Sequence, residues 1–173
     1  MYSCLVNSGW WESLGPVTCL GLLVACLCHD IDHRGRQRIT LTPQSYSCLI
    51  PGTNSNYLQA TNSPLAKLYS SSTLERHHLN QALIILNLDG HRILDSLSPG
   101  EYSKILSVIE HAILATDLAV HFSHLGRLNK LAASGSDGID WESDHSVDIV
   151  TAALMTAADL GATTKPWDYQ QKV

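Results

Sequence analysis

The stretch Cys28-His29-Asp30-Ile31-Asp32-His33-Arg34-Gly35 directly follows the most apolar run of the chain, Leu14 to Cys28. Two imidazoles and two carboxylates fall within the five residues from His29 to His33. Neutral imidazole suits zinc, whereas carboxylate oxygens suit a harder ion such as magnesium. If the apolar run is a helix, His29 and His33 share one face near its end, because residues four apart are neighbours on a helix. Asp30 could then bridge two ions.

The alternative interpretation of this stretch is a helix end whose charged side chains are exposed to water. A single His-Asp pair would favour that alternative. Three further clusters of acids and imidazoles occur downstream, however, around Glu75, Asp117 and Asp159. The nine histidines of the chain also suit metal or phosphate chemistry. The sequence therefore favours an active site that binds metal.

The size and composition of the chain are those of one globular domain. It has 173 residues, of which 45% are hydrophobic and 16% are charged. A chain of this length can bury a core without disulfides or metals to hold it together. The formal charge of -5 and the absence of a basic run argue against a nucleic-acid partner.

The cysteines and the apolar run indicate a reducing, cytoplasmic setting. Five cysteines without a CxxC pair do not suggest a disulfide scaffold. The run Leu14 to Cys28 has no basic residue before it, contains Pro16 and is shorter than the roughly 20 residues that a membrane span needs. We expect a buried helix there, apolar all round, and no membrane partner.

Helical periods and start signals predict an all-α fold, since no strand alternation stands out. Pro16 and Pro64 suit the first turns of helices. Ser72-Thr73-Leu74-Glu75 and Ser98-Pro99-Gly100-Glu101 resemble capping boxes. We expect helices from Pro16 to Cys28, from Pro64, from Ser72 to Leu88, from Ser98 through Ala115-Thr116-Asp117 towards Leu131, and from Asp144 to Leu160. Residues 36–52, rich in Ser, Thr and Pro, suggest a long loop.

Each downstream cluster also has an ordinary structural explanation. Glu75 could act only as a capping partner, and His77 and His78 could be surface residues. Thr116 could hydrogen-bond back to its own helix. Asp159 could be a solvated helix end, although a carboxylate that ends a buried helix is costly unless it is paired or bound to metal.

Taken together, the clusters resemble the class I 3',5'-cyclic-nucleotide phosphodiesterases. The four blocks that carry the resemblance occur in the family's order, from about Leu20 to Lys172: His29-Asp30-Ile31-Asp32-His33-Arg34-Gly35, Leu74-Glu75-Arg76-His77-His78, Ile113-Leu114-Ala115-Thr116-Asp117-Leu118 and Met155-Thr156-Ala157-Ala158-Asp159-Leu160-Gly161-Ala162-Thr163-Thr164-Lys165-Pro166-Trp167. The Asp140-Trp141 region and Asp159-Leu160-Gly161-Ala162 are most similar to the dual-specificity members with GAF domains, the type eleven enzymes in particular.

The resemblance implies a multi-helix phosphodiesterase catalytic domain with a two-metal site. His29, Asp30 and Asp159 would ligate one ion, usually zinc. Asp30 would bridge to a second, usually magnesium (or manganese), whose waters would be held by His33, Glu75 and Thr116. His78 would touch the phosphate. The implied reaction is metal-dependent hydrolysis of cAMP and cGMP to 5'-monophosphates in signal transduction, and the full-length protein is a possible homodimer.

The chain departs from the family pattern in three places. No histidine precedes His29, although the family carries another histidine ligand and the histidine general acid before it. The family's purine-binding glutamine and phenylalanine would lie beyond Val173. Residues 36–52 look like an insertion before Thr53-Asn54-Ser55-Asn56-Tyr57, and residues 1–15 like an unmatched segment. We therefore expect a partial catalytic domain at residues 16–173 with impaired activity.

Two other functions stay open from the sequence. One is a non-catalytic truncated product that binds partner subunits or metal without turnover. The other is a more distant metal phosphohydrolase of the His-Asp type. The Lys165-Pro166-Trp167 block and the block from Glu75 to His78 argue against the second.

Overall fold

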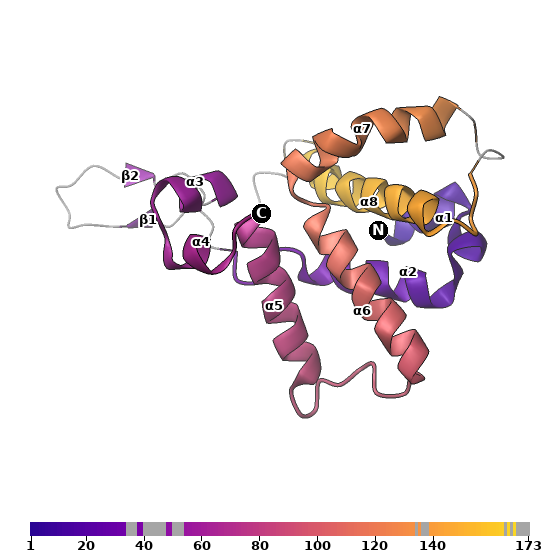
Figure 1. The fold of residues 1–173 in the computed structure, drawn as a ribbon, viewed down its shortest axis with the longest axis horizontal. Coiled ribbons are helices and arrows are strands. Elements are labelled where there is room, and N and C mark those ends of the chain that lie inside the picture. The colour runs from indigo at the N-terminus through magenta and orange to yellow at the C-terminus, as the bar shows by residue number, and fades with distance from the viewer. Residues whose placement is uncertain are drawn as a thin grey trace.

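The computed structural model describes residues 1–33, 38–39, 48–49, 54–133, 135, 139–164, 166 and 168. Within these residues the chain forms eight α-helices, one 3₁₀-helix and a pair of two-residue strands (Figure 1). The elements in chain order are α1 (Tyr2–Ser8), α2 (Trp11–Cys28), β1 (Arg38–Ile39), β2 (Cys48–Leu49), α3 (Ser55–Ala60), α4 (Pro64–Leu68), α5 (Thr73–Asn87), α6 (Pro99–Leu114), α7 (Leu118–Ala133), α8 (Asp144–Leu160) and η2 (Gly161–Thr164). The predicted all-α fold is confirmed, and the two strands pair antiparallel within the segment expected to be a loop.

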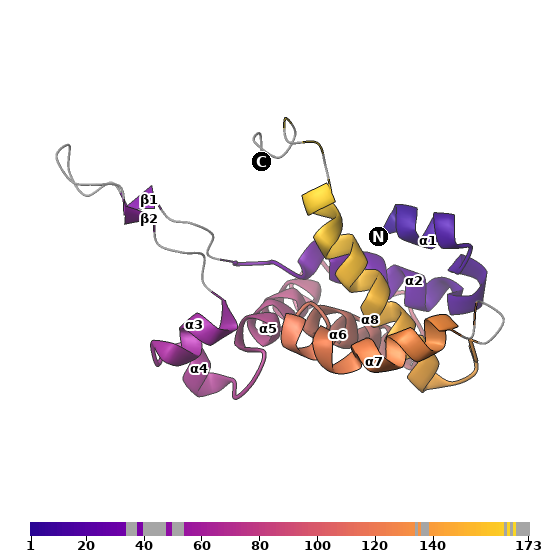
Figure 2. The ribbon, with the colours of Figure 1, turned by 90° about the horizontal axis from the view of Figure 1, so that it is seen from above.

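The core lies where α2, α6 and α8 pack on one another. Leu22 of α2, Ile105 and Ile109 of α6 and Met155 of α8 are completely buried. α5 packs on α6, α7 packs on α8, and α3 and α4 lie beside α5. Figure 2 shows α3 and α4 on the opposite side of the molecule from α1. The arrangement brings the C-terminal end of α2, the start of α5 and the C-terminal end of α8 around one region.

α2 begins at Trp11, before the predicted start at Pro16, but Pro16 does open the part of the helix that follows a kink. Gly15 has φ 76° and ψ 163°, so the helix is kinked there and continues regularly from Pro16. A positive φ costs glycine nothing, and proline at the next position suits a first turn because its missing N–H is not needed there.

The burial of α2 is less complete than predicted. Leu22 is buried, whereas Leu20 is 39% and Leu27 is 84% exposed. The helix is long and apolar enough to cross a membrane by length and composition alone. Its packing on α6 and α8 is also that of a core helix, and the absence of a membrane partner stays a prediction.

Three helices start where the sequence predicts. Pro64 begins α4, and α8 runs from Asp144 to Leu160 as expected. At α6 the capping box is complete, because the Ser98 side chain accepts from the Glu101 backbone N–H and the Glu101 side chain accepts from the Ser98 backbone N–H.

The capping box predicted at Ser72 is wrong, although a helix does start at Thr73. Ser72 has a left-handed backbone, with φ 44° and ψ 51°, and its side chain makes no cap hydrogen bond. Its Oγ instead donates to Asp117 Oδ2 at 2.7 Å. Glu75 Oε2 accepts from Ser55 Oγ at 2.8 Å. Both side chains are therefore engaged with other elements.

The continuous helix predicted through Ala115-Thr116-Asp117 is also wrong. α6 ends at Leu114, α7 begins at Leu118, and the two axes differ by 102°. Asp117 explains the break, because its Oδ1 accepts the Ala119 backbone N–H at 2.9 Å while its Oδ2 accepts from Ser72. A carboxylate in that position satisfies a free amide at the start of a new helix.

Candidate metal centre

The three predicted metal ligands lie together at the ends of two core helices. His29 follows the last residue of α2, and Asp159 is the penultimate residue of α8. The ligand atoms of His29, Asp30 and Asp159 all lie within 4.8 Å of one another. His29 Nε2 is 3.2 Å from Asp159 Oδ1 and 3.4 Å from Asp30 Oδ2.

The hydrogen bonds of His29 define which nitrogen faces the carboxylates. Its Nδ1 lies 2.9 Å from the Cys26 carbonyl oxygen, which can only accept, so Nδ1 carries the proton. The lone pair of Nε2 in the neutral ring therefore points at two carboxylate oxygens. This contact is repulsive unless the ring takes a second proton or a cation lies between the three groups.

The electrostatics of the group agree with this geometry. The hydrogen bond to Asp159 raises the pKa of His29, and burial partly opposes the shift. The same environment that holds a proton on Nε2 suits a cation there. One imidazole and two carboxylates are ordinary zinc ligands, and an Nδ1–H bonded to a backbone carbonyl is the usual orientation of a metal-bound histidine. The residues therefore fit a divalent ion.

The site is open to solvent on the Asp30 side. The His29 side chain is 17% exposed, that of Asp159 is 35% exposed and that of Asp30 is 63% exposed. An ion held here could keep positions for water or substrate, as catalytic sites do.

Two further histidines lie next to the group. The rings of His33 and His78 are 5.6 Å apart between centroids. His78 is 2% exposed, and neither of its ring nitrogens has a hydrogen-bond partner among the described residues. Burial lowers the pKa of His78, whereas the nearby Asp30 carboxylate acts in the opposite direction. His78 is therefore not the surface residue of the alternative interpretation.

Glu75 and Thr116 make other contacts. Glu75 accepts from Ser55, and Thr116 Oγ1 donates back to the Ile113 carbonyl oxygen at 2.7 Å. Among the described residues, no hydrogen bond or ion pair joins either side chain to His29, Asp30 or Asp159. The roles expected of Glu75, Thr116, His33 and His78 stay predictions.

Three residues that make contacts around the site were not among the predicted site residues: His77, Asp32 and Ser55. His77 Nε2 lies 2.8 Å from Asp32 Oδ2, which ties the stretch after α2 to α5. Ser55 Oγ also accepts the Leu74 backbone N–H at 3.1 Å. Asp32 has a positive φ of 61°. Aspartate adopts the left-handed region more readily than most residues, and this preference was the one signal of the turn in the sequence.

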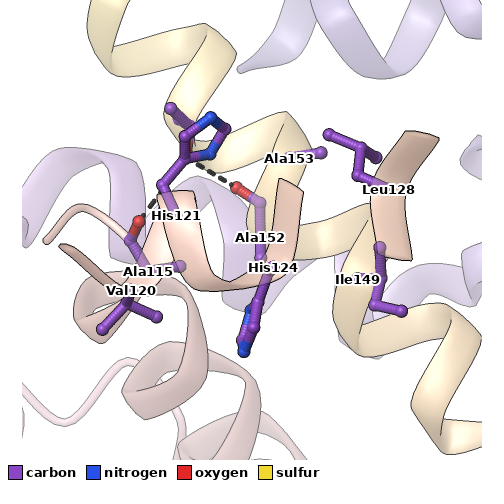
Figure 3. A pocket seen from close by; sticks show the side chains of 9 residues that line it. Ala115, Val120, His121, His124, Leu128, Ile149, Ala152 and Ala153 are labelled. Carbon is purple, nitrogen blue, oxygen red and sulfur yellow. Dashed lines mark hydrogen bonds between the residues drawn. The ribbon is translucent and has the colours of Figure 1, made fainter. Parts of the chain in front are cut away.

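A separate small cavity lies between α7 and α8 (Figure 3). It holds about 10 Å³, which is room for one water molecule. His121 and His124 line it from α7, and Thr156 Oγ1 donates to the Ala152 carbonyl oxygen at 3.1 Å on the other side. It is too small for a nucleotide.

Parts of two predicted stretches lie outside the described residues. Lys165 and Trp167 of the last block are not described, and of residues 36–52 only β1 and β2 are described.

Comparison with known proteins gives the family. A family model described as 3'5'-cyclic nucleotide phosphodiesterase matches residues 1–41 and 45–173. The chain is 39% identical over 173 residues to the dual 3',5'-cyclic-AMP and -GMP phosphodiesterase 11 of Drosophila melanogaster, covering all of the chain and 11% of that protein. It is 42% identical to the cGMP-specific 3',5'-cyclic phosphodiesterases of Drosophila pseudoobscura pseudoobscura and Drosophila melanogaster, covering all of the chain and 14% of each.

The chain thus spans between about a tenth and a seventh of the length of these relatives. The family match includes residues 1–15, which carried no resemblance in the sequence analysis, and it skips only residues 42–44, inside the predicted insertion. The domain boundaries stay a prediction. The family resemblance is confirmed: this chain belongs to the 3',5'-cyclic-nucleotide phosphodiesterase family.

Proposed function

We propose that the chain is the metal-binding part of an enzyme that hydrolyses cAMP and cGMP to 5'-monophosphates in signal transduction. The observation that carries the proposal is the group of His29, Asp30 and Asp159, whose ligand atoms lie within 4.8 Å of one another. Family membership supports the reaction, and relatives named as dual-specificity and cGMP-specific phosphodiesterases support both nucleotides.

The cofactors we propose are two divalent ions, zinc and magnesium (or manganese). His29 Nε2 and the Asp159 carboxylate would hold the first ion, and Asp30, the most exposed of the three, would border both. When bound, such ions lower the pKa of a water and neutralise charge that develops on the phosphate. The carbonyl of Cys26 keeps the His29 ring oriented for this task. His33, Glu75 and Thr116 would hold waters, and His78 would face the phosphate.

The 173 residues alone should hydrolyse cyclic nucleotides poorly. The family resemblance places a histidine general acid and a further histidine ligand before His29, and this chain has no histidine there. Loss of a general acid typically costs about 10² to 10⁴ in rate. A purified chain that turns over cGMP as fast as an ordinary enzyme would contradict this part of the proposal.

The reaction is tested with the full-length gene product. Hydrolysis of cAMP and cGMP should be lost on Asp159→Asn, because the amide keeps the shape of the side chain but not its charge. Asp95→Asn is the matched control, since Asp95 is an exposed acid in the connection between α5 and α6. Equal activity of the two variants, with intact folding, would rule out a catalytic centre at Asp159.

We also propose a cytoplasmic location, with no membrane or nucleic-acid partner and with a homodimer as a possible state of the full-length protein. The four cysteines whose side chains are described are free, which supports a reducing compartment. The net charge of -5 supports the absence of a nucleic-acid partner. Sedimentation of the full-length protein tests the dimer.

A further inference from the structure

We propose that His77 is a positioning residue for the candidate metal centre. Its hydrogen bond to Asp32 holds the turn at residues 29–33 against α5 and thereby keeps the Asp30 carboxylate beside His29. The inference rests on the proposed function, because it gives His77 a role only if the group of His29, Asp30 and Asp159 binds metal.

The turn itself is built from short backbone contacts. The Ile31 N–H donates to the Cys28 carbonyl oxygen at 3.1 Å, and the His33 N–H donates to the Asp30 carbonyl oxygen at 3.0 Å. Asp32 completes the turn with φ 61°, a conformation that costs energy for a residue with a side chain. Such a conformation persists where surrounding contacts favour it, so the contacts of Asp32 matter to the shape of the whole turn.

The contact with His77 is well placed to supply that support. Asp32 Oδ2 lies 2.8 Å from His77 Nε2, and the two residues are 45 positions apart in the sequence. The His77 side chain is only 13% exposed, whereas that of Asp32 is 55% exposed. The less exposed imidazole therefore anchors Asp32, and with it the turn, to α5.

The first turns of α5 provide a fixed support for His77. Ser55 contacts both Glu75 and the Leu74 backbone N–H, and Ser72 donates to Asp117. The His77 ring also lies beside the buried His78, with 6.3 Å between centroids, and His78 in turn lies beside His33. The turn is thus held against a helix that three other side-chain contacts keep in place.

Asp30 depends on this support because it has little else. Its carboxylate is 63% exposed, and within the described part of the chain its one hydrogen-bonding or ionic contact is with His29 Nε2 at 3.4 Å. The position of the carboxylate is consequently set by the backbone of the turn. If the turn shifts, Asp30 leaves His29 and Asp159, and the ligand group opens.

The test is the affinity of the purified chain for Mn²⁺, measured by titration calorimetry and checked by the electron paramagnetic resonance signal of bound Mn²⁺. We expect His77→Ala to weaken binding about tenfold, as loss of a supporting contact outside the ligands typically does. His77→Gln should restore affinity to within about threefold, because its amide nitrogen can reach the place of Nε2 and donate to Asp32. The control is His145→Ala, which removes an exposed imidazole of α8 that makes no hydrogen bond among the described residues.

A second background shows whether His77 acts through Asp32. Asp32→Gly removes the carboxylate but keeps a positive φ accessible. In that background His77→Ala should change Mn²⁺ affinity less than twofold, against the roughly tenfold effect in the original chain. A tenfold effect of His77→Ala in both backgrounds, or no effect in the original chain, would overturn the inference.

His29→Gln separates this inference from the proposed function. If that change leaves Mn²⁺ binding intact, the ligand group itself is wrong and both ideas fail. If His29→Gln abolishes binding while His77→Ala does not weaken it, only the positioning role fails. Circular dichroism of each variant identifies loss of fold. If His77→Ala does not fold, the Mn²⁺ affinities of His77→Gln and Asp32→Gly are compared instead.

Discussion

At the scale of single residues, two histidines of the site have opposite electrostatic environments. His29 faces two carboxylates, and its hydrogen bond to Asp159 raises its pKa. His78 is buried, and the loss of water lowers its pKa. The folded chain therefore prefers a protonated ring at one position and a neutral ring at the other, and both preferences affect stability.

The first prediction concerns the pH dependence of the metal-free chain. Because the folded state raises the pKa of His29, the stability from this residue is present below about pH 6.5 and is lost as the pH rises through the raised value. In EDTA, the melting temperature of the original chain should fall more steeply above that pH than that of His29→Gln. His145→Gln should follow the original chain. Identical slopes in all three would show that His29 is not held protonated by Asp159.

The second prediction concerns the unsatisfied ring of His78. Both of its nitrogens are buried without a hydrogen-bond partner among the described residues, and such groups typically cost about 1 to 3 kcal/mol each. His78→Leu should therefore leave the free energy of unfolding of the metal-free chain unchanged or raise it, while the same change in the full-length protein lowers hydrolysis. Urea denaturation measures the first effect. A loss of more than about 1 kcal/mol would mean that the ring is stabilising.

At the scale of elements, α2 and α6 pack closely where they cross at Gly21. A Cβ added at Gly21 would lie 2.8 Å from Val108 Cγ1 and 3.0 Å from Val108 Cβ. The two helices can approach this closely because residue 21 has no side chain. The contact fixes the direction in which α2 delivers His29 to the site.

The third prediction tests this crossing. Gly21→Ala should lower the free energy of unfolding by about 1 to 3 kcal/mol, the usual cost of overpacking a core. Gly126→Ala is the matched control, because a Cβ there meets nothing within 4 Å and α7 should gain about 0.5 to 1 kcal/mol of helix propensity. Thermal and urea unfolding of both variants measure the difference. Equal effects of the two changes would mean that α2 can shift away from Val108 at no cost.

The elements also show where sequence reasoning succeeds and where it fails. Pro64 and Ser98 mark helix starts correctly because each signal acts within one turn. The box at Ser72 fails because Ser72 and Glu75 find partners at Asp117 and Ser55, which are 45 and 20 residues away. No local pattern contains those partners.

At the scale of the whole molecule, the candidate site depends on long-range packing. His29 and Asp159 are 130 residues apart and meet only because α2 and α8 share the core. The residue types predicted metal chemistry, and the family resemblance grouped these ligands. The contact of Asp32 with His77 was missed because it needs the direction of α5 relative to the turn, which the sequence does not encode locally.

The fourth prediction follows from this assembly. A divalent ion that binds only the folded chain stabilises it by about 2.7 kcal/mol at 100 times its dissociation constant. For a chain of this size that corresponds to a rise in melting temperature of about 5 to 10 °C. Scanning calorimetry with Mn²⁺ should show this rise for the original chain and for Asp95→Asn, but not for Asp159→Asn. A similar rise in Asp159→Asn would place the ion elsewhere.

The two contacts of α5 at His77 and Glu75 have a consequence for the evolution of the chain. His77 contacts Asp32 and Glu75 contacts Ser55. Asp32 and Ser55 lie on either side of residues 42–44, which the family match skips. The entropic cost of closing a connection grows slowly with its length, by about 0.6 kcal/mol for each doubling. Asp32 and Ser55 are both attached to the first turns of α5. Residues can therefore be gained or lost between Asp32 and Ser55 without displacing the metal ligands. Length variation among relatives should therefore concentrate between these two anchors.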